Sequence, residues 1–202
     1  MAQLLSFILL LFVIDGLAAR PAGWLQKELL TANTGKDAAY LNQVERETLM
    51  YLNLARLYPK RFVELELAHY WGNDKHGNFL TNSSYKESLI KEMSSMQPVQ
   101  AFYPDRVMSA SARCFALEKE RIGGRTHERL SCKTDRFAEC ISFGMDNGRE
   151  IALQLLIDHL VPSLGHRWLC LNSDINKVGL GFAKHKTAGV SLVLEMDFYY
   201  TQ

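Results

Sequence analysis

The sequence lacks the features that mark several specialised classes of protein. Its 23 Lys and Arg are balanced by 22 Asp and Glu, and no run of basic residues marks one face, so neither a nucleic acid nor an anionic membrane is favoured as a partner. No internal repeat is present, and neither a His-Glu-x-x-His motif nor a zinc-finger cysteine spacing occurs. The composition, 48% hydrophobic and 22% charged over 202 residues, is that of an ordinary single-domain globular protein.

The N-terminus carries an apolar run from Leu4 to Ile14, followed by small residues that offer a cleavage site near residue 19. This pattern predicts a secretory signal peptide over residues 1–19. The run is shorter than the roughly 20 residues of a membrane span, and no cysteine follows it for a lipid anchor. We therefore expect a secreted protein, extracellular or periplasmic, without a stable membrane anchor.

Export changes how the cysteines are interpreted. The chain has four, an even number that favours disulfides in an oxidising compartment: Cys114, Cys132, Cys140 and Cys170. Four cysteines allow three pairings, and the sequence does not choose among them.

The rest of the chain divides into a short arm over residues 20–40 and one domain over residues 41–202. Apolar residues at helical spacing predict amphipathic helices in the domain, ended by prolines or glycines, over 41–58, 60–71, 85–96, 106–122 and 147–160. The last of these is apolar nearly all round, which is typical of a buried helix, and Asn147 is its expected N-cap.

In the final third of the domain the spacing of the apolar residues changes from that of helices to that of strands. Residues 137–144 read as a short strand, and 177–200 as two strands joined around 184–189. Helices that precede and separate a few late strands predict an α+β fold, with helices packed on an antiparallel sheet.

Two acids stand in apolar contexts: Glu139 in the predicted strand and Asp158 in the buried helix. Desolvating a lone carboxylate is costly, so each must be paired, hydrogen-bonded or beside a cavity. Histidines with carboxylates suit zinc or another divalent ion, and equally suit a buried hydrogen-bond network. The spacing leaves both interpretations open. His69, His76 and His185 fall in loops or turns and are expected to be solvated, and His159 to lie at a rim or on the surface.

Four blocks, "LNLARLYPKRF", "THE", "AECISFG" and "LLIDHLVPSLGHRWLCLNSDINKVGLGFA", resemble the CAP superfamily of cysteine-rich secretory, venom-allergen and pathogenesis-related proteins. The likeness spans about residues 40–200 and is nearest to the single-domain bacterial-type members. It implies an α-β-α sandwich with an antiparallel sheet.

The resemblance also implies a central cleft with two histidines and two acids, which fall on His127, Glu139, Asp158 and His166. In members of the family that bind zinc the histidines are the ligands, so His127 and His166 are the candidate ligands of zinc or another divalent cation. No organic cofactor is implied. Two departures are present: Asp158 replaces a longer Glu, and Cys140 replaces the usual Asn.

The resemblance implies a non-enzymatic extracellular binding module for a small lipid, a glycan or a protein. The alternative is a hydrolase of peptides or cell-wall polymers, in which Glu139 acts as general base while His166 or a metal polarises the carbonyl. In both cases Gly165 is expected to permit the close backbone approach that presents His166.

Overall fold

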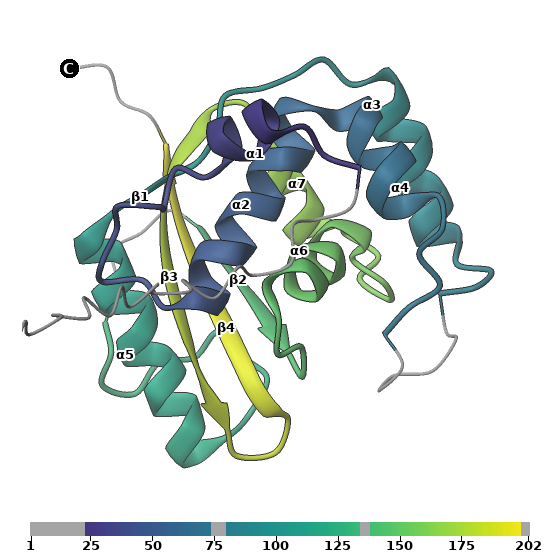
Figure 1. Cartoon of the computed structure of the whole chain (residues 1–202). Coiled ribbons are helices and arrows are strands. Elements are labelled where there is room, and N and C mark those ends of the chain that lie inside the picture. The colour runs from purple at the N-terminus through teal and green to yellow at the C-terminus, as the bar shows by residue number, and fades with distance from the viewer. Residues whose placement is uncertain (1–22, 74–79, 134–137, 199–202) are drawn as a thin grey trace, which may run out of the picture.

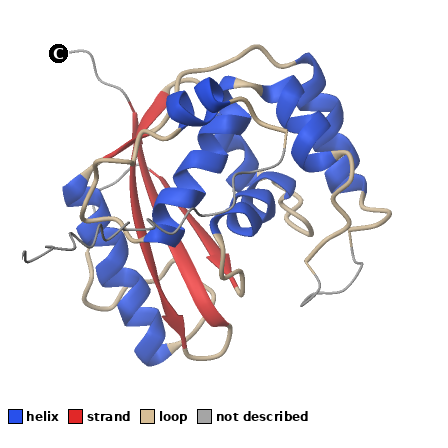
Figure 2. Cartoon of the chain, viewed as in Figure 1, coloured by secondary structure: helices blue, strands red, loops and turns tan. Residues whose placement is uncertain are grey.

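A computed structural model describes residues 23–73, 80–133 and 138–198, so the predicted signal peptide and His76 lie outside the described residues. Its centre is a four-stranded sheet in the order β1-β3-β4-β2. The strands are β1 (Tyr103–Pro104), β2 (Ala138–Phe143), β3 (Ile175–His185) and β4 (Gly189–Phe198). The mixture of helices and strands confirms the predicted α+β class (Figure 2).

Helices cover both faces of the sheet (Figure 1). On one face α5 (Arg106–Ile122) packs on β3 and β4. On the other face lie α2 (Gln43–Leu57), α6 (Gly148–Ile157) and α7 (Gly165–Leu171). The remaining helical elements extend this second layer, and they are α1 (Gln26–Ala32), α3 (Pro59–Phe62), the π-helical turn η1 (Val63–Leu67) and α4 (Ser84–Ser95). The predicted N-terminal arm thus contains α1, whose Leu29 and Ala32 join the core around α2.

The sheet is mixed, which corrects the expectation of an antiparallel one. β3 and β4 form the predicted hairpin and β2 pairs antiparallel with β4, but β1 pairs parallel with β3. β1 has only two residues, too few to leave an alternating pattern in the sequence. It arises because the chain enters α5 along the edge of β3, where the Asp105 amide donates to the Val178 carbonyl at 2.8 Å.

The helix ends follow local chemistry. Asn42 caps α2 and exchanges hydrogen bonds with Glu45, and Pro59 begins the next helix, as its fixed φ favours. Asn147 caps α6 through the amide of Glu150, as predicted. α6 ends at Ile157, three residues before the predicted end at 160, because its C-cap Asp158 turns to left-handed backbone with φ 56°.

Glycines in β3 set how closely the layers approach. A Cβ at Gly179 would lie 2.2 Å from the backbone of Met108, and one at Gly181 would lie 2.2 Å from the backbone of Arg113. Any side chain there would push α5 off the sheet, so the "VGLGF" pattern reflects helix-on-strand contact.

The cysteines behave as two pairs. Cys114 on α5 and Cys132 form a disulfide, which confirms part of the disulfide prediction. Cys140 on β2 and Cys170 on α7 are free thiols, so the prediction does not hold for them in this structure. Both are fully buried in the main core, where thiols pack as small apolar groups. A hydrogen bond with Cys170, together with burial, raises the pKa of Cys140, which excludes it as a ready nucleophile.

None of the helices in the described ranges is both long enough and apolar enough to cross a bilayer. The disulfide is compatible with an oxidising compartment.

The cysteine pattern predicts a thiol count. Without reductant, alkylation of the folded protein should label neither Cys140 nor Cys170 because both are buried. In guanidinium the same reaction should label two thiols, and four after reduction, as read by intact mass. Cys140→Ala should lower each of these denatured counts by one. Zero or four labels in guanidinium without reductant would contradict the pairing.

Candidate functional site

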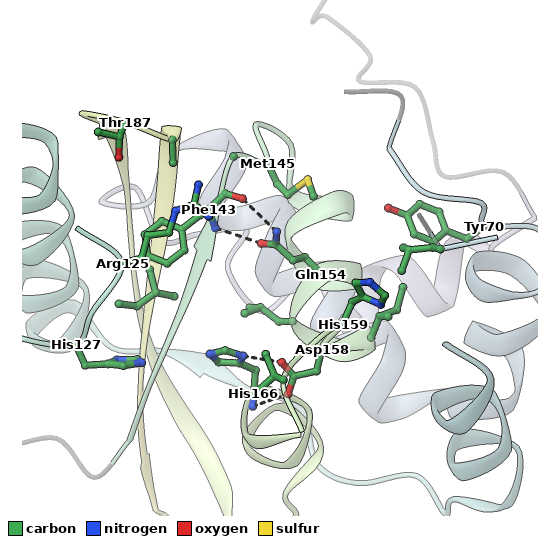
Figure 3. A pocket seen from close by; sticks show the side chains of 17 residues that line it. Tyr70, Arg125, His127, Phe143, Met145, Gln154, Asp158, His159, His166 and Thr187 are labelled. Carbon is green, nitrogen blue, oxygen red and sulfur yellow. Dashed lines mark hydrogen bonds and ion pairs between the residues drawn. The ribbon is translucent and has the colours of Figure 1, made fainter. Parts of the chain in front are cut away.

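A cavity of about 610 Å³ opens where the end of β2, the hairpin turn and the α6–α7 connection meet. Figure 3 shows the side chains around it. Polar and apolar side chains both line it, and the labelled polar ones lie on several sides of the cavity. The lining comprises Tyr70, Leu80, Arg125, His127, Ile141, Phe143, Gly144, Met145, Gln154, Leu155, Ile157, Asp158, His159, Val161, His166, Thr187 and Ala188.

Asp158 holds His166 from behind. Its Oδ1 lies 2.7 Å from Nδ1 of His166, and its Oδ2 accepts the backbone N–H groups of His166 at 3.0 Å and Arg167 at 3.3 Å. Asp158 is only 2% exposed, so the carboxylate is satisfied within the fold rather than by water. Because Nδ1 is engaged with an acid, Nε2 of His166 is the ring nitrogen presented to a ligand.

The backbone that presents His166 differs from the expectation for Gly165. Leu164, immediately before α7, takes the left-handed conformation with φ 51°, and Gly165 does not need it. A Cβ on Gly165 would make only ordinary contact, 3.5 Å from Ser163 Oγ. The carboxylate of Asp158, rather than a glycine, fixes the start of α7.

Glu139 holds His127 in the same way. Its Oε1 lies 2.8 Å from Nδ1 of His127, and its Oε2 accepts a hydrogen bond from Arg129. Arg129 also donates to Glu195 at 2.8 Å, and Glu195 stands opposite Glu139 in the β2–β4 register. Ser111 on α5 donates to the same oxygen of Glu195 at 2.7 Å.

The structure therefore brings the four predicted residues together in two pairs. His127, Asp158 and His166 line the cavity, whereas Glu139 lies behind His127. In Figure 3 the ring of His127 extends toward the side of the cavity where the ring of His166 lies. Each ring has Nδ1 on a carboxylate and Nε2 available to the cavity.

Both networks contain buried or nearly buried acids. These are Glu139, Glu195 and Asp158, and Arg129 binds the first two. The guanidinium of Arg167 pairs instead with Glu92 at 3.3 Å. Acids behind both imidazoles favour a cation or a hydrogen-bond donor in front of them.

Two histidines make only part of a metal site. Among residues 23–73, 80–133 and 138–198, no group of three or more His, Cys, Asp or Glu side chains is arranged to hold a metal ion. His127 and His166 could supply two ligands, and water or a ligand group would have to supply the others.

General-base chemistry is disfavoured. Glu139 has one oxygen on His127 and the other on Arg129, and its side chain is 12% exposed. A base must reach the proton that it removes, and this carboxylate is turned away behind His127.

The sequence did not identify some residues of the site. Gln154 accepts from the amide of Phe143 and donates to its carbonyl, so it fixes the end of β2 to α6. Its spacing of four from Asp158 on one helix face was the available signal. Glu195 is an acid in an apolar strand, so the desolvation argument that identified Glu139 as a residue in need of a partner applies to it as well. His159 was expected at a rim; it lines the cavity, with Nδ1 3.1 Å from Ser83 Oγ.

The chain matches no model of a known protein family and no curated protein.

The Asp158 geometry predicts a contrast between two substitutions. Asp158→Ala leaves buried donors without an acceptor and places Ala in left-handed backbone, so it should cost about 3 kcal/mol of unfolding free energy. Asp158→Asn retains an acceptor oxygen and tolerates that backbone, and should cost about 1 kcal/mol. Urea denaturation measures both, with exposed Asp174→Ala as control, and equal losses for the two variants would refute the account.

Glu118 on α5 supports the segment that carries His127 and Arg129. Its carboxylate accepts the backbone N–H groups of Leu130, Ser131 and Cys132 at 2.9, 2.7 and 3.2 Å. Burial raises its pKa, but these bonds and one from the Ser131 hydroxyl outweigh burial and lower the pKa from 4.5 to about 2.

A pKa lowered on folding stabilises the protein above the unfolded value, and this stability is lost as pH falls toward the folded value. The unfolding free energy should therefore decline between pH 5 and pH 2, less steeply in Glu118→Gln than in the unmodified protein. Exposed Glu87→Gln is the matched control and should keep the original slope. Parallel slopes for all three proteins in denaturant titrations would exclude this role for Glu118.

Proposed function

We propose that this chain is a secreted binding module of the CAP type, with an α-β-α sandwich fold and a ligand cavity rather than an enzymatic site. The resemblance in the sequence blocks supports the family, and helices on both faces of the sheet agree with its sandwich. The disulfide and the predicted signal peptide support secretion.

One observation carries the binding role: two histidines, each held at Nδ1 by an acid, present Nε2 to one cavity. Metal-binding histidines commonly have this carboxylate behind them, because it fixes the tautomer and raises the basicity of the free nitrogen. Zinc or another divalent cation would be held by His127 and His166, and would supply a Lewis-acidic point for an oxygen or nitrogen of the ligand.

Beyond the histidines, the cavity wall determines what else fits. Leu155, Ile157 and Val161 are among its apolar lining residues, and Gln154 and Arg125 are among its polar ones. Such a wall suits a small lipid, a glycan or a protein segment that carries one coordinating or acceptor group. Since both oxygens of Glu139 are engaged, binding is favoured over the alternative of hydrolysis.

Zinc binding should raise the melting temperature. At a hundredfold excess over the dissociation constant, ligand stabilisation is about 2.7 kcal/mol, which corresponds to roughly 5 °C or more for a domain of this size. Both His127→Ala and His166→Ala should abolish the rise, measured by differential scanning fluorimetry. His159→Ala removes a histidine from the same cavity without touching the pair, and should retain it. An unchanged melting curve in excess zinc would reject the metal.

A further inference from the structure

His185 occupies an unexpected place. It ends β3 at the hairpin turn, where a solvated side chain was expected, yet it is 4% exposed. Its ring meets the ring of Phe143 edge-on, with centroids 5.2 Å apart. The expectation of a solvated residue is wrong because a second segment, the bend at Gly123 and Gly124, lies against the turn.

The hydrogen bonds of His185 are those of a neutral ring. Nδ1 accepts the backbone N–H groups of Thr187 at 3.2 Å and Ala188 at 3.0 Å. Nε2 lies 2.9 Å from the carbonyl oxygen of Gly124 and therefore donates its hydrogen to it. One neutral tautomer satisfies all three contacts, since an imidazole nitrogen that accepts cannot also carry a proton.

These contacts join two parts of the cavity rim. Thr187 and Ala188 line the cavity from the hairpin, and Arg125 lines it from the residue after the bend. At the bend, Gly123 and Gly124 have φ of 75° and 82°, in the left-handed region that favours glycine, and the Gly123 N–H donates to the Lys119 carbonyl at 2.9 Å. The imidazole thus holds the turn and the bend to each other.

Protonation of the His185 ring would turn the attraction between Nδ1 and the two backbone amides into repulsion. The added proton goes to Nδ1, which would then point an N–H at two N–H donors. Three cations belong to the segments that meet here: Lys186 in the turn, Arg125 over the ring of Phe143 at 5.6 Å, and Lys119 on α5, whose Nζ lies 3.9 Å from the Cβ position of Gly124. A charged imidazole is accommodated only if the turn moves away.

We propose that His185 is an acid-sensitive latch at the cavity rim: neutral, it fastens the turn at 186–188 to the bend at 123–124, and protonated, it releases both. Release widens the rim beside Arg125 and Thr187 and frees a bound ligand. The latch is independent of what the cavity binds, and it goes beyond the proposed function.

Hydrogen exchange of single amides tests the latch. The amides of Thr187 and Ala188 should lose at least tenfold in protection between pH 7.5 and pH 5.0, after correction for intrinsic exchange. The amide of Leu194, buried in β4, should keep its protection over the same range. The loss should follow the protonation of the His185 ring, observed by NMR on the same samples.

His185→Asn separates the latch from general acid loosening. An asparagine oxygen reaches amides two and three residues on, as in Asx turns, and it does not titrate. Thr187 and Ala188 should then be equally protected at both pH values, whereas His185→Ala should lose protection at both. His159→Ala, in the same cavity, should behave as the unmodified protein does.

Constant protection in the unmodified protein would overturn the proposal, as would the same acid loss in His185→Asn. If His185→Asn fails to fold, the unmodified protein still tests the proposal. Loss of amide protection at Thr187 and Ala188 over a different pH range from the protonation of the His185 ring would overturn it equally. The measurements use a chelator and no ligand, so their outcome does not depend on whether His127 and His166 bind zinc.

Discussion

A buried arginine that binds backbone carbonyls holds the segment on which the cavity depends. Arg167 is 2% exposed, and it donates at 2.9 Å to the carbonyls of Leu156 and Ile157, the last of α6. A helix end leaves such carbonyls without partners, so the guanidinium replaces water there. Arg56 acts likewise beyond α7, binding the carbonyls that lead into β3, and burial lowers its pKa to about 10. The two cations fix α7 at both ends, and the position of His166 follows.

These hydrogen bonds stabilise a strained connection between α6 and α7. Asp158, Leu160 and Leu164 all have left-handed backbone between α6 and α7. Non-glycine residues in such regions cost about 1–3 kcal/mol each and persist where their surroundings compensate. Arg167 and the bonds accepted by Asp158 provide that compensation. The strain lies beside the cavity, which is where binding sites tend to concentrate it.

Much of the fold was predictable because its signals are local. Asn147 as a cap, Pro59 as a break and the period of the long helices each depend on a few neighbouring residues, and the structure confirms them. β1 and α7 were not predicted, since two and seven residues leave little periodicity. The expectation for Gly165 was wrong because a glycine before a histidine suggests backbone freedom. The left-handed backbone falls on Leu164 instead. It is compensated by the carboxylate of Asp158, which lies eight residues before His166 in the sequence.

The site was predictable only in part, for a different reason. Desolvation dictates that an acid in an apolar segment needs a partner, which identified Glu139 and applies equally to Glu195. It does not dictate which partner. In the structure Arg129 lies between these two acids and donates to both, so each oxygen of Glu139 is engaged. His185 presents the converse case: a turn position suggests water, but a distant bend supplies the carbonyl that buries it. Sequence therefore identifies side chains that need partners, and the contacts made in the fold decide which nitrogens are left for a ligand.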